Sequence, residues 1–306
     1  MSNLYNTPIL IIAFNRYDTT VQVFEMIKKL KPKYLYIAVD GPRKSKEGEA
    51  EKVENVKSIF NNIDWECEVH TLFRKQNLGC KMGVSSAITW FFEQVEMGII
   101  IEDDILLDPT FFNFAEEMLE YYKDEERVMD INAVNFQPKR RTTDSYYFSK
   151  YALVWGWATW RRAWAKYDVA IKDYNKNILS AFISNKKVLQ QFDKKFSQII
   201  SNELDTWDYQ WNYTIWKNSG LCITPEFNMC YNIGFGVDAT HTGGADFHAS
   251  KMKMVKMEFP VFHPDTKNIN IKADQYYELF AVEPSLYKRL LAKYFPELYR
   301  IYIKLF

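Results

Sequence analysis

The first 123 residues alternate between short strand-like runs and segments with helical periodicity, and this alternation restricts the fold more than any other feature of the chain. The predicted strands are residues 8–14, 34–39, 68–73 and 99–101. The predicted helices are residues 18–30, 48–60, 81–92 and 109–123. Strand–helix units that follow one another imply right-handed crossovers and a mostly parallel sheet flanked by helices. We therefore expect the α/β class with a Rossmann-like sheet.

The alternation stops near residue 130, where the chain becomes rich in tryptophan and small residues. Further elements are predicted as a strand at 128–134, a polar helical region at 172–200, an aromatic helix at 207–217 and an edge strand at 223–225. No long linker separates the two parts, so we expect one integrated domain. Its expected boundaries are 1–265, with a nucleotide-sugar half at 1–130, an acceptor and catalytic half at 131–265, and an extension at 266–306.

Composition excludes some partners and favours others. The 306 residues are 47% hydrophobic, which is enough for a sizeable core. Lys plus Arg equals Asp plus Glu at 39 each, so no global basic field argues for nucleic acid. The four cysteines form no CxxC pair, residues 1–7 lack the apolar stretch of a signal peptide, and no run is long enough to cross a membrane. These features predict a cytoplasmic protein.

Residues 286–306 combine Lys and Arg with regularly spaced apolar side chains and contain a single acid, Glu297. Basic amphipathic segments of this kind can lie on an anionic membrane surface. A terminal helix that docks on the core or on another subunit has the same pattern. The sequence leaves both alternatives open. If the segment lies on a membrane, we expect peripheral contact with the inner face of that membrane.

Three consecutive carboxylates, Glu102, Asp103 and Asp104, follow the apolar run at 99–101. Such a cluster is unfavourable unless a cation neutralises it, and oxygen ligands suit a hard divalent cation. Open α/β sheets bind ligands at the carboxyl ends of their strands. The pattern favours a metal ion that holds a diphosphate, although acids at the end of a strand also occur as the solvated start of a loop.

Charged side chains also follow the other predicted strands. Arg16 comes after the first strand and Asp40 after the second. An arginine can bind a phosphate or a base carbonyl, and a carboxylate can accept the imide N–H of a uracil. Lys81 lies in the glycine-containing segment 77–83, which precedes a helix whose N-terminus favours anions. That segment matches neither the P-loop nor the dinucleotide fingerprint, which argues against an ATPase and a nicotinamide enzyme.

Asp205 and Asp208 lie three residues apart, beside aromatic side chains. A carboxylate next to apolar rings has an increased affinity for protons, which suits a general base for a sugar hydroxyl. Asp205 is expected to cap the aromatic helix, and Asp208 to be the base. Nearby, Trp155, Trp157 and Trp160 have faces that can stack on sugars, although a core position is at least as compatible with two of them.

The segments 8–16, 40–41, 102–104, 156–157 and 207–208, with 225–226 after them, occur in an order that resembles the nucleotide-diphospho-sugar transferases of the GT-A fold. The similarity is greatest to the N-acetylglucosaminyltransferase I family and its bacterial relatives, and it covers about residues 8–245. It implies a metal-dependent, inverting hexosyl- or N-acetylhexosaminyltransferase. The implied donor is a nucleoside-diphosphate sugar, such as a UDP-sugar, and the implied cofactor is Mn²⁺ or Mg²⁺.

The resemblance also implies roles for individual residues. Asp104 would be the direct protein ligand of the metal, and Glu102 and Asp103 would contact donor hydroxyls and metal-bound water. Arg16 and Asp40 would hold the uracil or a nearby phosphate. We expect Lys81 to join this donor-binding group.

The same resemblance makes Asp208 the catalytic base and implies that the loop at 234–244 orders over the donor. The sequence departs from the eukaryotic family at Tyr209 and Gln210, where a second acid is usual, so Asp205 stays as an alternative base. A glycan acceptor, lipid-linked and used in surface polysaccharide synthesis, fits the basic tail.

Two other functions share parts of this pattern. A sugar-nucleotide pyrophosphorylase usually has a Gly-rich basic loop after the first strand, where this chain has residues 15–18. A non-catalytic carbohydrate-binding protein would not need the acidic triplet and Asp208.

Overall fold

The computed structural model describes residues 4–234, 252–281, 294–295 and 297–298. The strands are β1 (Ile9–Ala13), β2 (Tyr34–Val39), β3 (Glu68–Phe73), β4 (Met97–Glu102), β5 (Ile105–Leu107), β6 (Val128–Asn132), β7 (Tyr146–Ser149), β8 (Trp157–Trp160), β9 (Leu221–Pro225) and β10 (Cys230–Asn232). The helices are α1 (Tyr17–Leu30), α2 (Glu49–Ile59), η1 (Phe60–Asn62, 3-10), α3 (Gly79–Phe92), α4 (Pro109–Tyr121), α5 (Arg161–Trp164), α6 (Lys176–Phe182), α7 (Lys186–Ile200), α8 (Asp208–Lys217) and α9 (Ile271–Ala281). Beyond Gly234, the predicted donor loop lies outside the described residues, as does most of the 286–306 segment.

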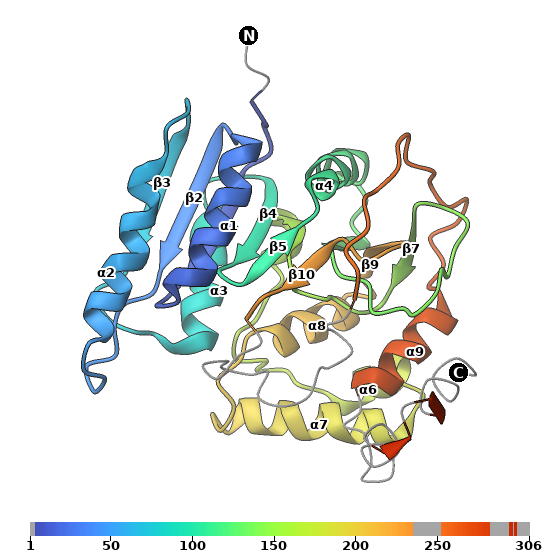
Figure 1. Cartoon of the computed structure of the whole chain (residues 1–306). Helices are drawn as coiled ribbons and strands as arrows, with labels where there is room; N and C mark the ends of the chain where they lie inside the picture. The colour runs from blue at the N-terminus through green and yellow to red at the C-terminus, as the bar shows by residue number, and fades with distance from the viewer. Residues whose placement is uncertain (1–3, 235–251, 282–293, 296, 299–306) are drawn as a thin grey trace.

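One eight-stranded sheet forms the centre of the molecule, in the order β3-β2-β1-β4-β8-β6-β9-β7. The first four strands in this order pair in parallel, as predicted. Strand β8 is antiparallel to both of its neighbours, β4 and β6, and β7 is antiparallel to β9. Strands β5 and β10 form a separate antiparallel pair. The protein is thus a mixed α/β fold with a large central sheet flanked by helices (Figure 1), which confirms the predicted class.

The parallel half follows directly from the sequence pattern. The residues of β1 are all buried, and so are those of β2 after its first residue. Right-handed crossovers place α1 and α2 on one face and α3 on the other, and Figure 1 shows α1 and α2 in front of the sheet. The predicted bounds of these strands and helices differ from the observed ones by only a few residues.

One prediction for the second half was wrong, and the predicted helical region at 172–200 is divided into two helices. The 223–225 segment is not an edge strand, because β9 lies between β6 and β7. Pro225 is tolerated there because it is the last residue of β9. The 172–200 region is two helices, since Ile183 is extended and the side chain of Asn185 accepts a hydrogen bond from the N–H of Lys187, which starts α7.

Helix α9 is attached to the edge of the sheet by buried polar contacts. The Ser149 hydroxyl donates to Asp274 Oδ1 over 2.6 Å, and Lys150 Nζ lies 2.8 Å from Glu278 Oε1. These contacts come from the end of β7 and the residue after it.

Within the described residues, every helix is too short or too polar to cross a bilayer.

Asp130 is a fully buried acid of β6, beneath α8. Its Oδ2 accepts a hydrogen bond from Trp211 Nε1 over 2.9 Å, whereas Oδ1 has no partner in the structure. Burial raises the pKa of Asp130 from 3.8 to about 7. Because the folded-state pKa is the higher one, the contribution of this group to stability is complete below pH 3.8 and is lost as the pH rises through about 7.

We therefore expect Asp130→Asn to stabilise the fold at pH 8, by up to about 4 kcal/mol, since each pKa unit corresponds to roughly 1.4 kcal/mol. At pH 4 the gain should disappear, because the native carboxyl is then almost wholly protonated. Urea unfolding at the two pH values measures this difference. The exposed Asp124→Asn is the control, and an equal effect of Asp130→Asn at both pH values would contradict the assigned cause.

Candidate active site

The candidate site begins where the strand order of the parallel half changes direction. Strands β1 and β4 are neighbours, and Ile12 pairs with Glu102 at their carboxyl ends. Ligands of open α/β sheets bind at the carboxyl ends of the strands, where the strand order changes direction in this way. Arg16 is the last residue of the short connection between β1 and α1, and the acidic triplet begins at Glu102, the last residue of β4.

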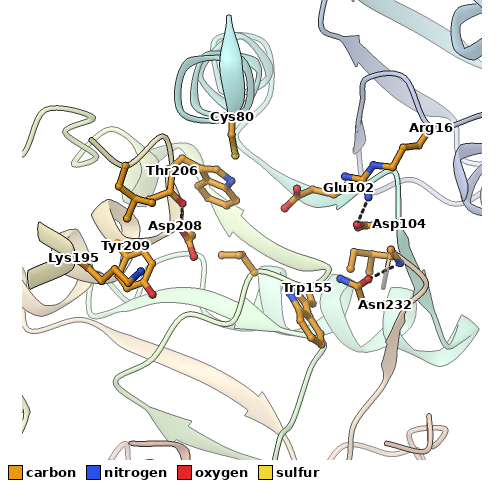
Figure 2. Close-up of a pocket in the computed structure, with 15 residues that line it drawn as sticks. Arg16, Cys80, Glu102, Asp104, Trp155, Lys195, Thr206, Asp208, Tyr209 and Asn232 are labelled. Carbon is orange, nitrogen blue, oxygen red and sulfur yellow. Dashed lines mark hydrogen bonds and ion pairs between the residues drawn. The ribbon is translucent and has the colours of Figure 1, made fainter. Parts of the chain in front are cut away.

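A cavity of about 340 Å³ lies at this crevice. Both halves of the chain contribute to it, as Figure 2 shows. Four residues predicted as site residues line it, namely Arg16, Glu102, Asp104 and Asp208. The other three predicted site residues, Asp40, Lys81 and Asp103, are not part of its wall.

Arg16 connects the first strand to the acidic triplet. Its Nη1 donates to Asp104 Oδ2 over 2.7 Å, and its Nη2 lies 3.6 Å from Asp103 Oδ1. The buried Asp103 also accepts the N–H of Phe14 over 3.2 Å. Asp103 therefore points inward and fixes the end of β1, whereas Asp104 is at the cavity.

Glu102 is the least compensated acid of the triplet. It is half-buried at the cavity, and the described residues give its carboxylate neither a hydrogen bond nor an ion pair within 4 Å. Burial, followed by the charges of Asp104 and Asp103, raises its pKa to about 8. The described residues contain no group of three or more His, Cys, Asp or Glu side chains that could enclose a metal ion.

These observations test whether the residues fit a divalent cation. Glu102 and Asp104 supply hard oxygen ligands. The raised pKa of Glu102 shows that its ionised form lacks a compensating charge, and a cation beside it would supply one. The described part of the chain offers too few ligands for a complete coordination sphere. The site therefore fits an ion that takes most of its ligands from a bound diphosphate and water, as Mg²⁺ commonly does.

Asp208 is the first residue of α8, on the other side of the cavity. The hydroxyl of Thr206 donates a hydrogen bond to Asp208 Oδ1, which fixes the carboxylate. Figure 2 shows Asp208 directed toward the cavity, between Tyr209 and Glu102. An acceptor hydroxyl in this cavity could thus reach a carboxylate that is held in place.

Asp205 does not cap α8, so that prediction was wrong. Its carboxylate accepts the backbone N–H groups of Cys80, over 2.8 Å, and Lys81, over 2.9 Å, and so caps α3 from a distant part of the chain. The physical reason is that α8 starts only at Asp208, whereas the first N–H groups of α3 lack a side-chain cap from Leu78. Gly79 is required here, because its φ is +76° and a Cβ would lie 2.6 Å from Asp205 Oδ2.

Asp40 holds the turn that precedes α3. Its carboxylate accepts hydrogen bonds from Asn77 Nδ2 over 2.9 Å, from the N–H of Leu78 over 3.0 Å and from the N–H of Gly41 over 2.9 Å. Burial raises its pKa, although these backbone hydrogen bonds oppose the rise. The structure thus gives Asp40 a structural task, and its contact with a base stays a prediction.

Lys81 points toward the second half of the chain and donates from Nζ to Asn202 Oδ1 over 2.8 Å. Its predicted contact with the donor also stays a prediction.

The sequence analysis did not identify Lys195 and Asn232 as cavity residues. Lys195 could have been noticed because it interrupts the apolar stripe of α7.

The tryptophans at 155–160 divide as the sequence suggested. Trp157 and Trp160 are buried in the core, whereas Trp155 is half-buried and lines the cavity. Trp155 precedes Gly156, whose φ of +68° turns the chain at the start of β8. Trp155 can offer a ring face to a sugar.

Comparisons with known proteins give only weak similarities. No family model matches the chain, and no curated protein matches it. Among solved structures, mouse xyloside xylosyltransferase 1 is 11% identical, with a TM-score of 0.36, and the match covers 69% of this chain and 81% of that chain. A UDP-glucose pyrophosphorylase complexed with UDP-glucose is 10% identical, with a TM-score of 0.37, over 74% and 92% of the two chains. A mannose-1-phosphate geranyltransferase from Thermus thermophilus is 10% identical, with a TM-score of 0.36, over 72% and 74%.

Proposed function

We propose that the chain is a glycosyltransferase that moves a monosaccharide from a nucleoside-diphosphate sugar, a UDP-sugar in the first instance, to a hydroxyl of a glycan acceptor. One observation carries the proposal: Arg16, Glu102 and Asp104 share a cavity with Asp208 from the other half of the chain. Transfer requires a group that stabilises the leaving diphosphate and, across the reacting carbon, a base for the acceptor hydroxyl. This cavity offers residues suited to both.

In this proposal Asp104, with Glu102 beside it, holds Mn²⁺ or Mg²⁺ together with the donor diphosphate. The ion, when bound, neutralises negative charge on the leaving group. Arg16 changes partner, from Asp104 to a phosphate oxygen or the base, when the donor binds. Asp103 keeps the end of β1 in position for these contacts.

Asp208 takes the proton of the acceptor hydroxyl as that oxygen attacks the sugar carbon. Its side of the cavity is opposite Arg16 and Asp104, as in-line displacement with inversion requires. The resemblance to the N-acetylglucosaminyltransferase I family, the hexosyl or N-acetylhexosaminyl donor, the lipid-linked polysaccharide acceptor and a cytoplasmic or peripheral membrane location belong to the same proposal.

A pyrophosphorylase is less compatible with the fold. Strand β1 ends at Ala13 and α1 begins at Tyr17, so only residues 14–16 connect them. That connection is too short for the Gly-rich basic loop expected in such an enzyme. A carbohydrate-binding protein would leave the uncompensated carboxylate of Glu102 without a purpose.

Titration calorimetry with UDP tests the proposal. We expect binding heat with Mn²⁺ present and at least about tenfold weaker binding after EDTA treatment, because Asp104 and Glu102 would hold the ion and the ion would add to the affinity for the diphosphate. Hydrolysis of a panel of UDP- and GDP-sugars with Mn²⁺ then identifies the donor. Nucleotide binding that does not depend on metal, or no binding at all, would contradict the proposal, and release of a nucleoside triphosphate from UDP-sugar and pyrophosphate would favour the pyrophosphorylase.

A further inference from the structure

Lys195 occupies an unusual place on α7. The buried residues of this helix are Val188, Phe192, Phe196 and Ile199. Lys195 is three residues after Phe192 and four before Ile199, so it lies on the same stripe. A lysine on an inward-facing stripe is unfavourable unless its amino group reaches a polar space, and here it reaches the cavity.

The described residues give Lys195 neither a hydrogen bond nor an ion pair within 4 Å. Its neighbour Asp193 is engaged elsewhere, with Lys176 Nζ at 2.5 Å and with the hydroxyl of Tyr174 at 2.7 Å. The other cation of the cavity wall, Arg16, is paired with Asp104. Lys195 is therefore the cavity cation that has no protein anion of its own in the described structure.

Figure 2 shows Lys195 beside Tyr209 and near Asp208, across the cavity from Arg16 and Asp104. If the diphosphate binds at the Arg16 side, the ammonium group is on the side of the base. A substrate that presents its hydroxyl to Asp208 would then place neighbouring substituents near Lys195.

We propose that Lys195 forms an anion subsite for the acceptor, which therefore carries a carboxylate or a phosphate close to its reactive hydroxyl. This inference rests on the proposed glycosyl transfer. The acceptor side of the cavity is identified as the side opposite Arg16 and Asp104, where the donor is proposed to bind. A uronic-acid carboxylate and a sugar phosphate share the required chemistry, and the experiment separates them.

Competitive acetylation of the 306-residue chain tests the subsite. A limiting amount of acetic anhydride is applied with glucuronic acid, glucose 6-phosphate, inorganic phosphate or glucose at constant ionic strength, and mass spectrometry measures each lysine. We expect an anion to slow acetylation of Lys195 at least threefold and glucose to leave it unchanged. The neighbouring Lys194 is exposed on the same helix and serves as the internal control. Protection by glucuronic acid alone identifies a carboxylate, and protection by the phosphates identifies a phosphate.

The variants Lys195→Met and Lys194→Met separate the acceptor side from the donor side. We expect the Kd for UDP with Mn²⁺ to stay within twofold of the native value in both variants, because the proposed subsite is on the acceptor side. Equal protection of Lys194 and Lys195, or no protection by any anion, would overturn the subsite. Protection of Lys195 by UDP, together with weaker UDP binding in Lys195→Met, would assign this residue to the donor and also overturn it.

The two proposals fail in different ways. Absence of metal-dependent UDP binding would reject the glycosyltransferase and leave the measured protection of Lys195 intact. Absence of protection would reject the anionic acceptor and leave metal-dependent UDP binding intact.

Discussion

Asp208→Asn is expected to bind UDP with Mn²⁺ as tightly as the native protein and to transfer sugar about a thousandfold more slowly, within the range that a general base contributes. The amide keeps the size of the carboxylate and can still accept from Thr206, which donates to Asp208 in the native site. What it loses is the capacity to take a proton. Calorimetry with UDP and single-turnover transfer from the donor found in the hydrolysis screen measure the two effects separately.

Asp205→Ala is the matched comparison, because the sequence alone left both acids open as the base. Its carboxylate accepts two backbone N–H groups at the start of α3, so its removal should lower stability by about 1–2 kcal/mol, as loss of a helix cap does. Transfer at a temperature well below unfolding should change only a few-fold. If Asp205→Ala lost transfer and Asp208→Asn retained it, the two roles would be exchanged.

The parallel half of the fold could be predicted because its signals are local. Strands β1, β2 and β4 are buried apolar runs, and polar or charged residues end each of them. Neighbouring parallel strands bring these ends to one edge, so the meeting of Arg16 with the acidic triplet followed from topology. The ion pair between Arg16 and Asp104 is the physical result.

The second half was harder to predict because its strands are short and pair across long sequence distances. Strand β8 is four residues long and lies between β4 and β6 in the sheet. The tryptophans in β8 and just before it are equally compatible with ligand platforms and with core positions. Only packing shows that Trp157 is buried while Trp155 reaches the cavity. Pro225 suggested an edge strand because the pattern did not show that it is the last residue of β9.

The tasks of single polar residues were the least predictable. Asp40 and Asp205 both have the residue type and position of ligand-binding acids, yet each accepts backbone N–H groups around α3. Whether a carboxylate is directed to a ligand or to its own chain depends on a few ångströms of loop geometry that no spacing encodes. Lys195 was missed for the opposite reason, since a lysine in a polar helix attracts no notice until the apolar stripe is located.

Asp104→Asn is expected to weaken UDP binding in the presence of Mn²⁺ by about a hundredfold, since loss of even a supporting group around a metal reduces its affinity by roughly 10–100-fold. The native Asp104 also holds Arg16 at 2.7 Å, so the variant releases that guanidinium. Without metal, UDP should therefore bind to the variant as well as to the native protein, or more tightly.

Asp104 could act as a metal ligand or only orient Arg16. Comparing UDP binding of the native protein and of Asp104→Asn with Mn²⁺ and in EDTA distinguishes these two roles. If the residue acts as a metal ligand, native protein and variant differ with Mn²⁺ and converge in EDTA. If it acts only by orienting Arg16, the variant is impaired to the same extent in both conditions, and the metal role is rejected. Asp18→Asn is a suitable control, because Asp18 is an exposed acid two residues beyond Arg16. Its affinity for UDP should equal that of the native protein with and without the ion, which ties any loss in Asp104→Asn to the cavity and not to the general charge around α1.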